Sequence, residues 1–133
     1  MISAVIDTNV LVSGLWTHDS NAPTKRILSA LLSNEFVFYQ NDQILSEYVD
    51  VLNREKFNFD KEEVARLIEH IRCTGKTMLP NHSAETFPDP DDRVFYEVAL
   101  AEPDSRLVTG NLKHYPTSPI VVTPSQFCKA LGL

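Results

Sequence analysis

The chain has 133 residues, 43% of them hydrophobic, and a formal net charge of −6 at pH 7. This length and apolar share suit one globular domain with one core, spanning residues 1–133. No apolar stretch approaches the roughly 20 residues of a membrane-spanning helix, and the N-terminus lacks a signal-peptide pattern. We therefore expect a cytoplasmic protein without a membrane partner.

The acidic charge does not decide whether the protein binds nucleic acid. Phosphate binding normally favours a basic surface. A cation bound among carboxylates reverses their charge locally, however, so a metal-dependent nuclease can be acidic overall. A mild acidic excess is also simply compatible with solubility. Net charge therefore leaves both classes open.

Two cysteines, Cys73 and Cys128, share no metal-binding or redox spacing, and both fall in predicted helices. We expect them to be reduced packing residues rather than a disulfide or a zinc site.

Strand-like apolar runs alternate with helical periods along the chain. The predicted strands are residues 2–6, 36–39, 77–79, 106–108 and 120–122. The predicted helices lie at about residues 24–33, 42–54, 61–73, 90–102 and 125–131. Strands separated by helices of this length favour an α/β fold with a parallel sheet. Right-handed crossovers bring the carboxyl ends of all strands to one edge, where such sheets bind ligands.

The first predicted strand ends in Asp7-Thr8-Asn9. A carboxylate at the end of a buried strand is partly desolvated, so a metal, a base or backbone donors must compensate it. The alternative is that Asp7 caps a helix that starts near Asn9 or Val10. The residues alone leave both interpretations open.

Glu47 lies at the edge of an apolar stripe in the predicted helix 42–54. The stripe comprises Ile44, Leu45, Tyr48, Val49 and Leu52. Glu47 falls just outside it and can reach past the core towards a crevice, whereas Asp50 points well away and should be a solvated charge. An ordinary boundary glutamate is the alternative.

The segment Asp89-Pro90-Asp91-Asp92 precedes the predicted helix 90–102. Capping by Asp89, proline at the first helical position and acidic residues in the first turn explain much of this pattern. Three carboxylates in four residues repel one another, and this repulsion raises their proton affinities unless a cation holds them. Asp92 stands one turn before Phe95, so it can turn inward towards a site.

Thr109-Gly110-Asn111 follows the fourth predicted strand. Gly110 permits a tight turn or the close approach of a ligand, and Thr109 and Asn111 offer uncharged oxygen ligands or hydrogen-bond donors. Lys113 and His114, just beyond, are weaker candidates for phosphate contacts.

In this order and spacing the segments resemble the PilT N-terminus (PIN) domain. The resemblance is closest to the single-domain PIN proteins described as toxins of prokaryotic toxin–antitoxin systems, and it spans essentially the whole chain. The motifs that carry it are Asp7-Thr8-Asn9, Ser46-Glu47, Asp89-Pro90-Asp91-Asp92, Val108-Thr109-Gly110-Asn111 and the ending Ile120–Phe127.

The resemblance implies a three-layer α/β/α fold with a five-stranded parallel sheet, and a Mg²⁺- or Mn²⁺-dependent ribonuclease. It places the acidic metal ligands and catalytic residues at Asp7, Glu47 and Asp92. Many PIN domains carry a fourth acidic residue where this chain has Asn111. Asp89 and Asn111 are therefore further candidates for the metal site.

The resemblance also implies supporting groups and partners. Asn9 and Thr109 would orient the carboxylates. An antitoxin protein would cover the crevice and insert a basic side chain among the carboxylates, and a homodimer is expected. The substrate would be RNA.

Two other functions are compatible with the residues. A phosphohydrolase of the haloacid-dehalogenase type would use Asp7 as a nucleophile, but this chemistry normally needs a second Asp where Asn9 stands. A PIN-like module that binds RNA or a partner protein without cutting is the second alternative, and Asn111 is the residue that favours it.

Overall fold

The structure, a computed structural model, describes residues 2–133. Its strands form a five-stranded sheet in the order β3-β2-β1-β4-β5, and every neighbouring pair is parallel. The strands are β1 (Ser3–Ile6), β2 (Val37–Gln40), β3 (Lys76–Thr77), β4 (Ser105–Val108) and β5 (Val121–Val122). The predicted α/β class and parallel sheet are confirmed.

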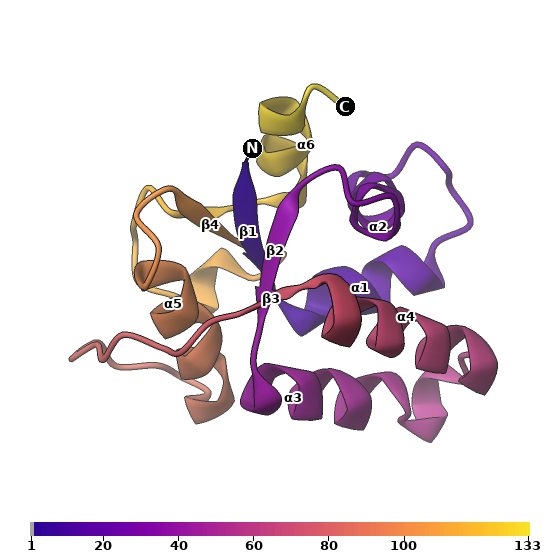
Figure 1. Cartoon of the computed structure of the whole chain (residues 1–133), viewed down its shortest axis with the longest axis horizontal. Helices are drawn as coiled ribbons and strands as arrows, with labels where there is room; N and C mark the ends of the chain where they lie inside the picture. The colour runs from indigo at the N-terminus through magenta and orange to yellow at the C-terminus, as the bar shows by residue number, and fades with distance from the viewer. Residues whose placement is uncertain (1) are drawn as a thin grey trace.

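Helices cover both faces of this sheet, which gives the three-layer α/β/α arrangement of a PIN-like fold. In Figure 1, α5 lies on one side of the strands and α1 and α2 on the other. The helices are α1 (Thr8–Trp16), α2 (Pro23–Leu32), α3 (Asp42–Leu52), α4 (Lys61–Thr74), α5 (Arg93–Leu100) and α6 (Pro124–Leu131). Three short 3-10 turns complete the described elements: η1 (Glu55–Phe57), η2 (Pro90–Asp92) and η3 (Leu112–His114).

Helix α1 was predicted only as an alternative, the helix near Asn9 or Val10 that Asp7 would cap, and it starts at Thr8. Its sequence holds three β-branched residues and a glycine, which lower helix propensity and resemble a continuing strand. Packing explains why the segment is helical nevertheless. A Cβ at Gly14 would lie 3.0 Å from the carbonyl oxygen of Thr24 and 3.3 Å from Leu28, so the missing side chain lets α1 and α2 approach closely.

Other boundaries differ from the prediction in smaller ways. The predicted helix 90–102 is the 3-10 turn η2 followed by the shorter α5, and β3 comprises two exposed residues. Cys128 is buried as expected, but Cys73 is exposed on α4, so the prediction that Cys73 packs in the core is wrong. Its thiol lies 3.2 Å from a carboxylate oxygen of Glu69, one turn earlier on the same helix.

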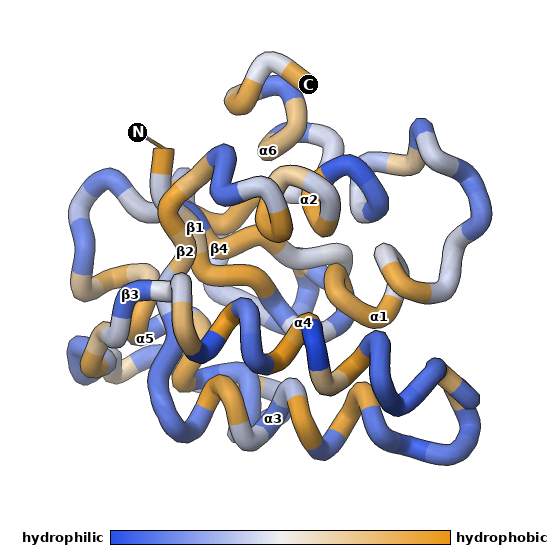
Figure 2. Tube along the Cα trace, turned by 45° about the vertical axis from the view of Figure 1, so that its right-hand side comes forward, coloured by the Kyte–Doolittle hydropathy of each residue, from blue (hydrophilic) through white to orange (hydrophobic). Residues whose placement is uncertain are grey.

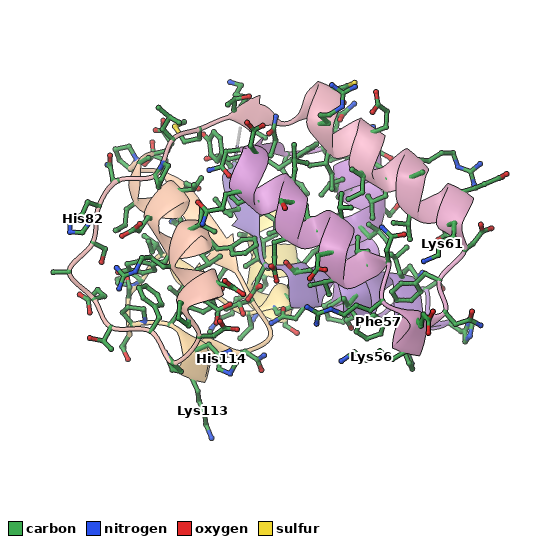
Figure 3. The ribbon with its side chains drawn as sticks, turned by 90° about the horizontal axis from the view of Figure 1, so that it is seen from below. Lys56, Phe57, Lys61, His82, Lys113 and His114 are labelled. Carbon is green, nitrogen blue, oxygen red and sulfur yellow. The ribbon has the colours of Figure 1, made fainter. Side chains whose placement is uncertain are left out.

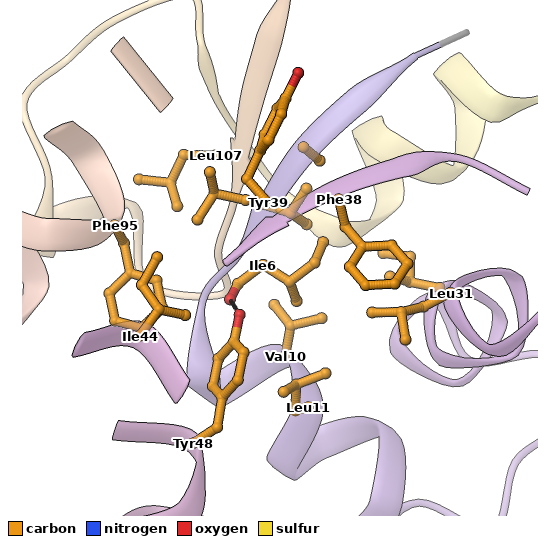
Figure 4. Close-up of a cluster of buried hydrophobic side chains, with 14 of the residues drawn as sticks. Ile6, Val10, Leu11, Leu31, Phe38, Tyr39, Ile44, Tyr48, Phe95 and Leu107 are labelled. Atoms are coloured by element: carbon orange, nitrogen blue, oxygen red, sulfur yellow. Dashed lines mark hydrogen bonds between the residues drawn. The ribbon is translucent and has the colours of Figure 1, made fainter. Parts of the chain in front are cut away.

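The core lies on the central strands and the helix faces turned towards them. Figure 2 shows hydrophobic segments gathered along β1 and β2, whereas α3 and α4 alternate between hydrophobic and hydrophilic residues. Ile6, Phe38 and Leu107 of the sheet are buried, together with Ile44 of α3 and Phe95 of α5 (Figure 4). No helix within residues 2–133 has the length and apolar character needed to cross a bilayer.

Tyr48 fixes α3 to the end of β1. Its buried hydroxyl donates a hydrogen bond to the backbone carbonyl of Ile6, the residue before Asp7 (Figure 4). Ile6 is the last residue of β1, so its buried carbonyl has no partner in a neighbouring strand. The Tyr48 hydroxyl supplies the hydrogen bond that the sheet does not.

We expect Tyr48→Phe to lower the free energy of unfolding by about 1–3 kcal/mol, because the Ile6 carbonyl then loses its buried hydroxyl donor. Urea denaturation measures the change. Tyr39→Phe is the control, since Tyr39 is also mostly buried but its hydroxyl has no hydrogen-bond partner among residues 2–133. Equal losses in both variants would contradict the assignment.

Candidate active site

The site is built where β1 and β4 end side by side. The two strands pair in register from Ser3 with Ser105 to Ile6 with Val108, so the next residues, Asp7 and Thr109, emerge together. The backbone N–H of Asp7 donates to the carbonyl of Val108 at 2.9 Å. Asp7 and Thr109 are therefore neighbours in space although 102 residues separate them in the chain.

Asp7 is a buried carboxylate that receives several hydrogen bonds on one oxygen. Its side-chain atom Oδ2 accepts bonds from Thr109 Oγ1 at 2.8 Å, Tyr115 OH at 3.0 Å and Asn9 Nδ2 at 3.2 Å. Asp7 occupies the N-cap position of α1, but its side chain makes no capping hydrogen bond. The helix of the alternative interpretation is therefore present, but the side-chain hydrogen bonds of this carboxylate are made to the site rather than to the helix end.

Burial has the largest effect on the pKa of Asp7. Desolvation raises the pKa of its carboxyl group, while the hydrogen bonds from Thr109 and Tyr115 lower it, and the pKa is raised on balance. The surrounding donors thus compensate only part of the cost of burying this charge. A cation next to the carboxylate would supply the rest.

Asp92 is the second carboxylate at this edge. It ends the turn η2, and its side chain is 15% exposed. Burial and the negative charges of Asp7 and Asp89 raise the pKa of Asp92 to about 6, although His114 lowers it. His114 Nδ1 lies 3.2 Å from Asp92 Oδ2.

Glu47 and Asp89 extend the acidic surface away from Asp7. Asp89 caps η2, where its Oδ1 accepts from the backbone N–H of Asp91 at 3.0 Å. Glu47 is partly exposed on α3, and its pKa is raised by burial first, then by the charges of Asp91, Asp50 and Asp89. Asp89 therefore couples electrostatically to both Asp92 and Glu47. Asp50 itself is exposed and paired with Arg54 at 3.0 Å.

These carboxylates line one acidic surface but do not form a closed metal cage. Within residues 2–133, no three His, Cys, Asp or Glu side chains gather tightly enough to hold an ion. The charge of Asp7 raises the pKa of Asp92, whereas the pKa of Glu47 is raised by the charges of Asp91, Asp50 and Asp89. The donors still suit Mg²⁺ or Mn²⁺, because such hard cations take one or two carboxylates and retain several waters.

The neighbouring residues divide into a supporting group and a solvent-facing group. Thr109 is fully buried, and its hydroxyl oxygen accepts from Asn9 Nδ2 at 3.4 Å and from the backbone N–H of Asn111 at 3.0 Å. The side chains of Asn111 and Lys113 are exposed. Lys113 extends away from the molecule, while His114 lies against it (Figure 3).

Tyr115 is the site residue that sequence reasoning missed. It is buried, and burial together with the charges of Asp7 and Asp92 raises the pKa of its phenol, so the hydroxyl stays protonated as a donor to Asp7. In the sequence a tyrosine after Lys113-His114 is indistinguishable from a core aromatic residue. Only the fold shows that its hydroxyl faces a carboxylate.

A comparison with protein families agrees with this geometry. The profile of the PIN domain family matches residues 3–113, and the chain belongs to that family. PIN domains in general are metal-dependent nucleases. A search of curated proteins gave no significant match.

The raised pKa of Asp92 predicts a stability that falls as pH rises in metal-free protein. The pKa of Asp92 is about 6 in the folded protein, against an ordinary value of 3.8 in the unfolded chain. Between these two pH values the folded state retains a proton that the unfolded chain has lost, so the free energy of unfolding declines as pH rises through this window. We expect Asp92→Asn to remove a decline on the order of 2 kcal/mol over this window. Urea unfolding in chelator at several pH values measures it.

The control for this measurement is Asp104→Asn, which changes an exposed aspartate between α5 and β4. That variant should keep the wild-type pH profile. A wild-type stability that rises with pH as much as that of Asp92→Asn would contradict the prediction.

Proposed function

We propose that this protein is a Mg²⁺- or Mn²⁺-dependent endoribonuclease that hydrolyses RNA phosphodiester bonds. The observation that carries the proposal is the buried Asp7 carboxylate beside Asp92 at the carboxyl edge of the sheet. Two like charges are held together there, and their neighbours compensate them incompletely. A divalent cation with RNA phosphate next to it is the partner that this arrangement favours.

In this proposal the acidic residues have different roles in metal binding and in activating water. Asp7 and Asp92 hold the cation, with Asn9, Thr109 and Tyr115 keeping Asp7 in place. Glu47, more exposed on α3, orients or deprotonates the attacking water. When bound, the cation acidifies water and neutralises charge on the scissile phosphate.

The uncharged Asn111 favours one firmly bound cation. A two-metal site needs a second set of ligands about 3.5–4 Å from the first. Asp89 is available for it only in part, since one of its oxygens already caps η2. Asn111 offers an amide oxygen but no charge.

The biological role is proposed from the sequence resemblance. A cytoplasmic single-domain toxin would be paired with an antitoxin that covers the crevice, and the toxin would form a homodimer. The acidic surface around Asp7 and Asp92 supports this, because it would accept a basic side chain of such a partner.

A non-cutting PIN module that binds RNA or a protein is the second candidate. It is favoured by Asn111 and by the absence, within residues 2–133, of three acidic, His or Cys side chains gathered tightly enough to hold an ion. The presence of Asp7, Glu47 and Asp92 together argues against it.

We expect the purified protein to cleave RNA in the presence of Mn²⁺, and we expect this cleavage to stop when a chelator is added. Asp7→Asn and Asp92→Asn should each lower the rate at least about 100-fold, since losing a group that merely supports a ligand costs 10–100-fold. Asp104→Asn is the control and should cleave normally. RNA binding without chelator-sensitive cleavage would favour the non-cutting module.

We expect Tyr115→Phe to weaken Mn²⁺ binding, measured by calorimetry without RNA, by about 10-fold or more. Its matched control is Tyr96→Phe. Both rings are buried and pack against Phe87, with centroids 6.2 and 5.7 Å away, but the Tyr96 hydroxyl has no hydrogen-bond partner among residues 2–133. Equal Mn²⁺ affinity in the two variants would contradict a supporting role for the Tyr115 hydroxyl.

A further inference from the structure

A second, uncharged cavity adjoins the acidic site on the α1 side. It has a volume of about 150 Å³, and its lining includes Asn9, Ser13, Thr24, Gly110, Asn111 and Pro124. That volume is several times the roughly 10–15 Å³ that one water molecule needs, so a group larger than water can enter. We call this cavity the neutral cleft.

The neutral cleft is polar without carrying a charge. No Asp, Glu, Lys, Arg or His lines it. A phosphate or an ammonium group would have no opposite charge to pair with in the cleft. A hydroxyl group, in contrast, could form hydrogen bonds with the hydroxyl and amide groups of the lining. The cleft therefore suits a neutral, hydrogen-bonding part of a ligand.

Its walls offer both donors and acceptors. The hydroxyls of Ser13 and Thr24 lie 3.0 Å apart, so one donates to the other and one O–H with several lone pairs stays available. The exposed Asn111 amide makes no side-chain hydrogen bond among the residues described. A ligand hydroxyl, which both donates and accepts, matches this set.

One side chain separates the neutral cleft from the carboxylates. Asn9 Nδ2 donates to Asp7 Oδ2 at 3.2 Å, and Asn9 Oδ1 accepts from the backbone N–H of Gly110 at 3.2 Å. Asn9 is thus part of both sites. A group in the cleft would belong to the nucleotide adjacent to a phosphate held at Asp7.

Gly110 leaves the shared wall open, although the fold does not require a glycine there. Its φ is outside the left-handed region, and a Cβ would meet nothing nearer than Asn9 Oδ1 at 3.7 Å. An alanine would therefore fit the folded chain. The missing methyl group instead leaves room for a ligand beside Asn9.

We propose that the neutral cleft binds the ribose next to the scissile phosphate and recognises its 2′-hydroxyl, which makes the enzyme selective for RNA over DNA. The 2′-hydroxyl is the donor and acceptor that distinguishes the two nucleic acids. This inference rests on the proposed ribonuclease function and names the group that its substrate must carry.

The test pairs a change in the substrate with a change in the protein. Cleavage of a short RNA is mapped first, and 2′-deoxynucleotides are then placed singly on either side of the cut. For the wild type, we expect one of these substitutions to lower kcat/KM about 10-fold, the effect of one or two hydrogen bonds. In Thr24→Val the same substitution should matter about 2-fold or less.

Two further variants keep the test specific. Ser29→Ala removes an exposed hydroxyl from the same helix, outside the cleft, and should retain the wild-type sensitivity to 2′-deoxy substitution. Gly110→Ala should keep the wild-type melting temperature but raise KM for RNA several-fold, because its methyl group narrows the cleft.

The outcomes separate the ribose site from the ribonuclease function. Wild-type cleavage that ignores both 2′-deoxy substitutions would overturn the ribose site but leave the ribonuclease in place. A full 10-fold sensitivity retained in Thr24→Val would likewise overturn it. Absence of chelator-sensitive cleavage of every substrate would refute the ribonuclease itself.

Discussion

The burial of one carboxylate, that of Asp7, is the constraint on which the arrangement of this site depends. A parallel strand at the centre of the sheet ends in it, so water cannot solvate it freely. Three side chains from α1, the end of β4 and the segment after η3 donate to the same oxygen. Such charge-assisted bonds are about twice as strong as neutral ones, yet the pKa of Asp7 remains raised. The hydrogen bonds therefore do not fully compensate the burial of this charge, and the proposed function rests on that deficit.

The segment between β3 and η2 supports the same carboxylate indirectly. It has no periodic sequence pattern, but α5 holds it firmly: Arg93 donates to the carbonyl of Ser83 at 2.8 Å, and Glu97 accepts from the backbone N–H of Ser83 at 2.7 Å. This places the Phe87 ring against Tyr115, whose hydroxyl bonds Asp7. The Phe87 ring thus links this segment to Asp7 through Tyr115.

Sequence patterns predicted the parts of this site that depend on strand order. The apolar runs before Asp7 and Thr109 predicted two parallel strands with a common carboxyl edge, and the sheet confirms it. The sequence predicted α1 only as an alternative to a metal ligand at Asp7, because the Gly14 contact that stabilises this helix is made with the next helix, α2, and has no local signature. The sequence did not indicate Tyr115, since a hydroxyl facing a carboxylate has no local signature. The helical position of Glu47 was predicted and is confirmed by α3, but the charges that act on it depend on how α3 packs against η2.

The two sides of the β4 edge differ in charge, and this difference accounts for Asn111. Towards α5 and α3 lie the carboxylates, whose mutual repulsion favours a cation. Towards α1 and α2 the cavity contains only neutral groups, and Asn111 lines it. An aspartate at this position would add a charge facing the hydroxyl pair of Ser13 and Thr24 and would repel the phosphates that flank a bound ribose. A neutral amide avoids this repulsion while still donating and accepting hydrogen bonds. In the proposed ribose site, the neutral Asn111 therefore serves to bind the substrate sugar rather than a second cation.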